Sequence, residues 1–134
     1  MINYRDYFAE HDLFARHNGL ELLEAGEGRA LVRMVIMPYH FNAAGTVHGG
    51  AIFTLADFAF AVASNSHGRI AMGINTSVNF VKAAVKGILH AEAVENSLNS
   101  KLGTYTVTVT DDDKSTIAIF QGMVYRKKVS ILQE

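Results

Sequence analysis

The segment NAAGTVHGGAIFTLADFAFAVASN, residues 42–65, is the most apolar long segment of the chain and contains a single charged side chain, Asp57. A pair of glycines precedes a run in which apolar residues occur on nearly every side of a helix, from Ala51 to Ala63. A helix that is apolar all round is buried on most of its faces. The sequence therefore predicts a long, central, buried helix over residues 49–65.

Asp57 is unusual in such a helix, because a carboxylate in apolar surroundings without partners either costs several kcal/mol or shifts its pKa. Thr54, Asp57, Ala61 and Ser64 follow one another at intervals of three or four residues and share one side of the helix. One interpretation is that this side faces solvent. However, it lacks the Lys, Glu and Arg of a solvated face, and large apolar neighbours such as Phe53 flank it. We therefore expect it to lie at a packed interface or in a small cleft.

Strand-like sequence lies on both sides of the predicted helix, with the turn Gly26-Glu27-Gly28 marking a hairpin between the first two strands. The expected strands lie in residues 20–36, which hold two of them, and in residues 69–81, 88–97, 102–110 and 115–127. The short turns between the later strands favour antiparallel neighbours. These features predict an α+β fold in which an antiparallel sheet of about six strands wraps around one long helix.

The strand expected after the helix alternates cleanly, and successive residues of a strand point to opposite faces of its sheet. We expect one face to belong to the core and the other to be small and polar. The predicted core face consists of Ile70, Met72, Ile74, Thr76, Val78 and Phe80. The predicted opposite face consists of Ala71, Gly73, Asn75, Ser77 and Asn79.

Length and composition limit the class of protein. The 134 residues fit one domain, residues 1–134, with a helical segment over residues 1–17 that we expect to act as a lid or an edge cover. A net charge of −1 offers no electrostatic footprint for nucleic acid, and no window approaches the ~18 apolar residues of a membrane span. Charged residues interrupt the apolar residues of the N-terminal stretch, unlike a signal peptide, so we expect a cytoplasmic protein.

The content of reactive side chains excludes several chemistries. The chain has no cysteine, which excludes disulfides and a thiol nucleophile. Its six histidines show no metal-ligand spacing, and the sequence holds no phosphate-binding loop or serine nucleophile elbow. We therefore expect no metal and no bound cofactor.

The segment GTVHGG, residues 45–50, precedes the helix and could hold an anion. Glycines at a helix start allow backbone N–H groups to approach a ligand closely, and the helix dipole there favours negative charge. Such a terminus can stabilise a developing oxyanion. The alternative is that the glycines only make a tight turn and that His48 is a satisfied structural histidine.

The pattern N-x-x-G-T-V-H-G-G-x-x-x-x-x-x-D, residues 42–57, resembles the acyl-CoA thioesterases of the phenylacetate-degradation type within the hotdog-fold superfamily. The resemblance spans roughly residues 17–127 and includes NFVKA at residues 79–83, which is similar to NFLRP in that family. It implies a hotdog fold and hydrolysis of acyl-CoA thioesters, with coenzyme A entering only as part of the substrate.

The resemblance also implies roles for individual residues. The glycine after the histidine, here Gly49, donates its backbone N–H to the thioester carbonyl, and the helix acid, here Asp57, serves as general base or nucleophile. Asn42 and His48 line the same pocket and help to position the thioester or water. The expected substrate-binding residues are Gly50, Phe53 and Lys82, the last near the phosphates of coenzyme A. In several relatives a hydroxyl residue orients the water, and its position falls here on Gly73.

The spacing of Gly49 and Asp57 adds a geometric constraint. Eight residues at ~1.5 Å each separate the two by about 12 Å along the helix, which exceeds the reach of one reacting carbon. We therefore expect Gly49 of one subunit to face Asp57 of another, in a homodimer that the family commonly pairs into a homotetramer.

The substrate predicted in this way is an acyl-CoA with an aryl-acetyl, other aromatic, or short-to-medium acyl group. Two alternatives stay open at this point. One is a noncatalytic acyl-CoA sensor on the same fold, and the other is a hotdog dehydratase acting on a hydroxyacyl thioester.

Overall fold

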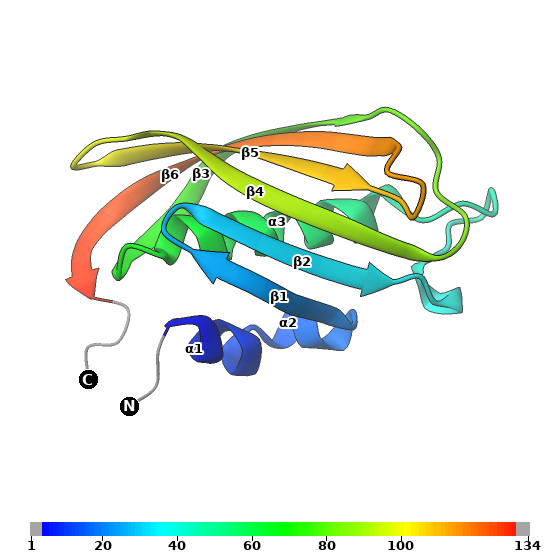
Figure 1. Cartoon of the computed structure of the whole chain (residues 1–134), viewed down its shortest axis with the longest axis horizontal. Coiled ribbons are helices and arrows are strands. Elements are labelled where there is room, and N and C mark those ends of the chain that lie inside the picture. The colour runs from blue at the N-terminus through cyan, green and yellow to red at the C-terminus, as the bar shows by residue number, and fades with distance from the viewer. Residues whose placement is uncertain (1–3, 131–134) are drawn as a thin grey trace.

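The computed structural model describes residues 4–130, and residues 1–3 of the predicted N-terminal segment lie outside them. Within this part of the chain, six strands form one antiparallel sheet in the order β1-β2-β4-β5-β6-β3 (Figure 1). The elements are α1 (Tyr4–His11), α2 (Leu13–His17), β1 (Leu20–Gly26), β2 (Arg29–Val35), a 3-10 turn (Pro38–His40), α3 (Gly49–Asn65), β3 (Arg69–Phe80), β4 (Ile88–Leu98), β5 (Leu102–Thr110) and β6 (Thr116–Ser130).

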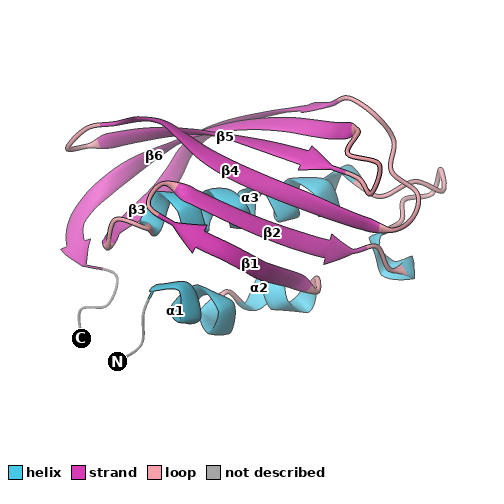
Figure 2. Ribbon diagram, viewed as in Figure 1, coloured by secondary structure: helices cyan, strands magenta, loops and turns pink. Residues whose placement is uncertain are grey.

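The core lies between the sheet and α3, which the sheet wraps around (Figure 2). Leu55, Ala56, Ala59, Val62 and Ala63 of the helix have no exposed surface at all, as expected for a helix that is apolar on most sides. The predicted antiparallel sheet around one long helix is confirmed. No helix among residues 4–130 is both long and apolar enough to cross a lipid bilayer.

The C-terminal end of α3 is tied firmly to the sheet. The amide of Asn65 accepts from Ala71 N–H at 2.9 Å and donates to Ala71 O at 3.2 Å, so it pairs with the backbone of β3 as a neighbouring strand would. Ser66, directly after the helix, accepts from the Gly28 N–H at 2.7 Å. These bonds hold α3 at one end, and its N-terminal end carries the candidate site.

Strand β3 differs from the predicted alternation in its first half. Its pairing with β6 shifts between Gly73 and Asn75, which marks a β-bulge. A bulge inserts an extra residue and so exchanges the faces of the residues on either side of it. After the bulge, Val78 packs against the core as predicted, whereas before it Ala71 faces the core and Met72 is 53% exposed. The assignment of Met72 and Ile74 to the core face was therefore wrong. Thr76 and Phe80, which the pattern also places there, are exposed as well, and the Phe80 ring lies beside Gly49 and not in the core.

Phe60 of α3 explains two glycines in the sheet. A Cβ atom at Gly122 would lie 2.6 Å from Phe60 Cζ, and one at Gly73 would lie 3.0 Å from Phe60 Cε2. The ring therefore occupies the space that side chains would need at both positions. Any side chain at Gly73, including a hydroxyl residue, would therefore require the Phe60 ring to shift.

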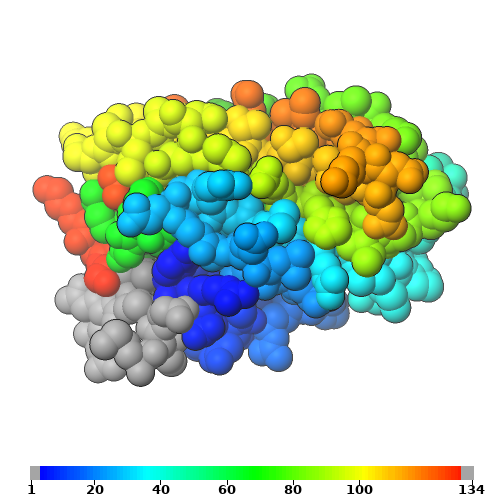
Figure 3. Space-filling model, in the orientation of Figure 1, coloured from blue at the N-terminus to red at the C-terminus, as the bar shows by residue number. Residues whose placement is uncertain are grey.

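The two edges of the sheet differ in whether another element covers them. Helices α1 and α2 lie along β1, and Figure 3 shows their side chains against those of β1 and β2. Within the described residues, β3 pairs on one side only, with β6. Large apolar side chains on and just after this open edge are more than half exposed: Met72, Ile74, Phe80, Val81 and Val85. An edge of this length and apolarity favours pairing with another chain.

Candidate active site at the start of the central helix

His48 caps the N-terminus of α3. Its Nδ1 atom accepts a hydrogen bond from Gly50 N–H at 2.8 Å, and its backbone N–H donates to His40 O at 2.7 Å. A ring nitrogen that accepts carries no proton, so a neutral His48 carries its proton on Nε2. The cap leaves the N–H of Gly49, the first residue of the helix, without an acceptor among residues 4–130. This N–H is a free donor at the positive end of the helix dipole.

Asn42 shapes the loop that leads to this terminus. Its Oδ1 atom accepts from Ala44 N–H at 2.9 Å and from Thr46 N–H at 3.1 Å, while its Nδ2 atom donates to Thr46 Oγ1 at 2.9 Å. These bonds form an Asx turn, which the short amide side chain of Asn favours. Within the single chain, Asn42 therefore acts as a support of the loop.

Three of the predicted site residues line one surface hollow of about 380 Å³ beside the helix start: Asn42, Gly49 and Lys82. Phe80, at the end of β3, lines the same hollow, and a Cβ atom at Gly49 would lie 3.2 Å from its Cζ atom. Lys82 Nζ lies 3.6 Å from Asp111 Oδ2, so a cation stands at the rim. Sequence reasoning missed Phe80, because the strand pattern placed it in the core face and carried no signal of its contact with Gly49.

The other three predicted pocket residues, His48, Gly50 and Phe53, line a second recess of about 440 Å³. This recess lies between α2, the Pro38–His40 turn and the first turns of α3. The ring of Phe53 also packs edge to face on Phe120 in the core, with centroids 5.4 Å apart. The residues predicted as one site are therefore divided between two hollows that meet at the start of α3.

Asp57 lies two turns further along α3 and is exposed in the single chain. Within the described residues, no hydrogen bond or ion pair reaches its carboxylate. Although the residue is exposed, partial desolvation by the surrounding protein raises its pKa, and the negative charge of Asp12 raises it further. Both causes disfavour the ionised form, so the carboxylate that does form is a stronger base than an ordinary aspartate.

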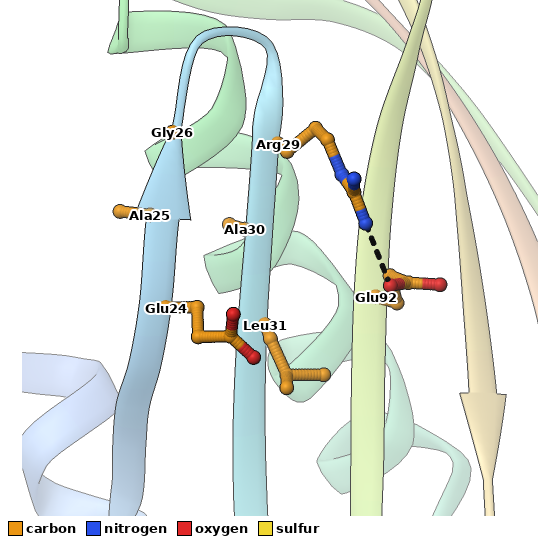
Figure 4. A pocket seen from close by; sticks show the side chains of 7 residues that line it. All are labelled: Glu24, Ala25, Gly26, Arg29, Ala30, Leu31 and Glu92. Atoms are coloured by element: carbon orange, nitrogen blue, oxygen red, sulfur yellow. Dashed lines mark hydrogen bonds and ion pairs between the residues drawn. The ribbon is translucent and has the colours of Figure 1, made fainter.

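A further hollow lies on the outer surface of β1, β2 and β4 (Figure 4). Arg29 of β2 reaches across to Glu92 of β4, with Nη2 and Oε2 3.1 Å apart, and Glu24 of β1 lines the same hollow. None of the predicted site residues lies there. An exposed ion pair of this kind contributes little binding or stability.

Comparison with known proteins agrees with the resemblance seen in the sequence. The sequence model described as "Thioesterase superfamily" matches residues 44–118, the part that contains the helix start, α3, the strands β3, β4 and β5, and the first residues of β6. The chain belongs to the thioesterase superfamily. It is therefore an enzyme, and of the predicted residues in the Gly49 hollow, Gly49 and Lys82 lie within the matched region, whereas Asn42 lies just before it.

Curated relatives of this thioesterase cover nearly its whole length. A putative esterase of Archaeoglobus fulgidus is 45% identical over 123 residues, which are 91% of this chain and 80% of the relative. The acyl-coenzyme A thioesterase PaaI of Escherichia coli is 31% identical over 118 residues, which are 87% of this chain and 84% of the relative.

Solved structures agree with the sequence relatives. The E. coli PaaI protein from the phenylacetic acid degradation operon superposes with a TM-score of 0.86 at 26% identity, covering 97% of this chain and 99% of that one. A mutant of the phenylacetic acid degradation protein PaaI from Thermus thermophilus gives a TM-score of 0.83 at 34% identity, covering 87% and 100%. The predicted PaaI-like hotdog thioesterase fold and acyl-CoA thioester hydrolysis as the general activity are confirmed.

Proposed function

We propose that this thioesterase hydrolyses acyl-CoA at sites shared between two subunits, with Gly49 of one subunit as the oxyanion donor and Asp57 of the partner subunit as the general base. The observation that carries the proposal is the free Gly49 N–H at the capped start of α3, since it is a donor without an internal acceptor. Asp57 is about 12 Å further along the same helix, so a second copy must supply the base.

The arrangement at the start of α3 supports the proposed role of the Gly49 N–H as the oxyanion donor. As water attacks the thioester carbonyl, negative charge moves to the carbonyl oxygen, and a preorganised N–H stabilises that charge without having to reorient. His48 holds the first turn of α3 through Gly50, and Asn42 holds the preceding loop, so both act on the position of the Gly49 N–H. The helix dipole adds to the same effect.

The raised pKa of Asp57 supports its proposed role as the general base. The carboxylate takes a proton from water, the hydroxide oxygen bonds to the carbonyl carbon, and a tetrahedral oxyanion forms. Its collapse breaks the carbon–sulfur bond and releases the free acid, while the coenzyme A thiolate leaves and takes up the proton. The alternative is direct attack by Asp57, which gives a mixed anhydride that water then hydrolyses. In ¹⁸O water, a single turnover labels the Asp57 carboxylate only in the second route, when water attacks the aspartyl carbonyl of the anhydride.

The open edge of β3 supports the homodimer. Its unpaired backbone and its exposed apolar side chains, among them Met72 and Phe80, suit pairing with the same strand of a second copy. Phe80 lies at this edge and also against Gly49, so a subunit docked there would reach the candidate site. A homotetramer of two such dimers is part of the same proposal.

Lys82 supports binding of the coenzyme A portion at the Gly49 hollow, because an ammonium group at an exposed rim suits a phosphate. Its present partner is the Asp111 carboxylate, 3.6 Å away, while the lysine side chain itself is 54% exposed and can reach a phosphate. The reaction requires no cofactor besides the coenzyme A of the substrate.

Gly49→Pro tests the oxyanion donor, because proline removes the N–H from the first position of a helix, where proline is well tolerated. His48 already has the extended conformation that precedes proline, with φ −60° and ψ 136°. Gly49→Ala is the matched control, since it adds a Cβ atom against Phe80 but keeps the N–H. We expect kcat to fall about 10²–10³-fold in Gly49→Pro and much less in Gly49→Ala. Equal losses in the two folded variants would refute the role of the N–H.

Mixing the variants tests whether the site is shared. Gly49→Pro and Asp57→Asn are each expected to be nearly inactive, yet a mixed dimer contains one site with both groups intact. Random mixing makes half of the dimers mixed, so we expect about a quarter of wild-type activity to return. Activity that stays absent after verified subunit exchange would place Gly49 and Asp57 in separate functions.

A further inference from the structure

The recess between α2, the Pro38–His40 turn and α3 is lined by aromatic side chains and adjoins the helix start. Phe14, Tyr39, Phe41 and Phe53 all line it, and among residues 4–130 no lysine, arginine, aspartate or glutamate does. Phe14 is 64% exposed and Tyr39 is 63% exposed, so two of the large rings that line the recess are in contact with solvent. Its volume of about 440 Å³ falls within the range of roughly 300–1,000 Å³ typical of small-molecule sites.

The two hollows that meet at the start of α3 differ in chemistry. Gly49 opens into the hollow with Lys82 and Asn42, whereas the next residue, Gly50, opens into the aromatic recess. An acyl-CoA whose carbonyl lies at the Gly49 N–H must send its charged coenzyme A portion and its acyl group in different directions. The cation favours the coenzyme A portion on one side, and the uncharged recess favours an apolar acyl group on the other.

We propose that this recess is the acyl subsite and that Phe14 of α2 and Tyr39 determine which acyl groups the enzyme accepts. The proposal rests on the function proposed above and extends it to the N-terminal helices. An acyl group longer than acetyl reaches the recess and covers the two exposed rings, whereas an acetyl group ends near Gly49. Selectivity for longer apolar acyl groups therefore comes from a segment that precedes the matched thioesterase region.

The wall formed by α2 is held in place before any ligand arrives. Asp12 caps the helix by accepting from Ala15 N–H at 3.0 Å, and Ala15 is buried against the core. The buried ring of His40 joins the two walls, because its Nδ1 accepts from Met37 N–H at 3.0 Å and its Nε2 then donates to Asn18 O at 3.0 Å. His40 thus links the Pro38–His40 turn, which carries Tyr39, to the end of α2, which carries Phe14.

Leu13 provides a matched control on the same helix. It precedes Phe14 and is 70% exposed, but it does not line the recess. We would measure kcat and KM for acetyl-CoA, hexanoyl-CoA and phenylacetyl-CoA with the wild type, Phe14→Ala, Tyr39→Ala and Leu13→Ala. We expect KM for the two longer substrates to rise about tenfold in Phe14→Ala and Tyr39→Ala, with kcat retained. The acetyl-CoA constants, and all constants of Leu13→Ala, should stay near the wild-type values.

Dissociation constants separate this proposal from the proposed function. Titration calorimetry of the same thioesters on Asp57→Asn, with and without Phe14→Ala, reads acyl selectivity without turnover. A tenfold loss confined to the longer acyl groups supports the subsite even if the wild type hydrolyses none of them, which would refute only the proposed function. Equal losses for acetyl-CoA and the longer thioesters, or no loss, would overturn the subsite. A change of oligomeric state in Phe14→Ala, seen by sedimentation, with unchanged selectivity would instead make the recess a subunit contact.

Discussion

Replacing His48 separates its structural contribution from any chemical one. The Nδ1 atom of His48 is the cap of α3, a helix of 17 residues, through one hydrogen bond of 2.8 Å from Gly50 N–H. In His48→Ala this N–H loses its partner, and the first turn, which carries the Gly49 N–H, is free to fray. We therefore expect both stability and activity to fall.

The size of the stability change follows from the cap alone. Loss of a side-chain cap costs about 1 kcal/mol of unfolding free energy. For 134 residues the entropy of unfolding near the midpoint is about 280 cal/mol/K, so Tm should fall by about 4 °C. Displacement of the oxyanion donor by ~1 Å is enough to lower kcat about 10²-fold.

His48→Asn is the variant that divides the two effects, because asparagine caps helices well but has no imidazole. Scanning calorimetry gives Tm, and a thiol reagent follows coenzyme A release without background, since the protein contains no cysteine. If His48 acts only as a cap, His48→Asn regains both Tm and kcat. If it also positions the substrate, His48→Asn regains Tm but not kcat.

An unchanged Tm in His48→Ala would refute the reasoning, because it would mean that the bond to Gly50 contributes nothing to α3. A His48→Asn variant as unstable as His48→Ala would refute it equally, provided that circular dichroism shows both to be folded. Either result would make the order of the helix start independent of residue 48.

The remaining predictions concern the carboxylate of Asp57 and the packing of the Phe60 ring against Gly122. Asp57→Asn should lower kcat about 10²–10⁴-fold and raise Tm at pH 7, because a raised pKa means that the ionised carboxylate opposes folding. The gain in Tm should shrink as the pH falls through the raised pKa. It should vanish below the ordinary value of 3.8, where the Asp57 carboxyl is protonated in both the folded and the unfolded state. Thermal melts at several pH values measure this gain, and a gain that grows toward low pH would contradict the prediction. Gly122→Ala should cost about 1–3 kcal/mol, since its Cβ atom would lie 2.6 Å from Phe60 Cζ, and Phe60→Leu should restore much of the loss. Gly26→Ala, with no atom within 4 Å of its Cβ atom, is the control in urea unfolding, and a cost equal to that of Gly122→Ala would contradict the packing argument.

The sequence predicted the fold correctly where a periodic pattern depends only on neighbouring residues. The all-round apolarity of residues 51–63 predicts a buried helix, because no arrangement leaves such a helix in water. The same reasoning failed in β3, where Met72 is exposed although the alternation places it in the core. The bulge after Gly73 causes the error, and it lies in the pairing of β3 with β6, a strand more than 40 residues further along the chain.

In the candidate site, too, the sequence predicted the local features but not the contacts between separate elements. The motif GTVHGG predicts a helix start with free N–H groups, and His48 and Gly49 lie there because caps are set by neighbouring residues. The sequence did not indicate that Asn42 and Lys82 share a hollow with Phe80, or that Phe53 lines a different hollow. These neighbours come from different strands and loops, so only the packed chain brings them together.

The long helix, the hairpin of β1 and β2, and the positions of Gly49 and Asp57 on one helix follow from the sequence alone, since each depends on residues close together in the chain. The tertiary structure decided which faces β3 presents, which side chains flank Gly49, and how α2 builds a wall beside it. The physical reason is range. Capping and periodicity act over a few residues, whereas bulges, hollows and open edges result from packing between distant segments.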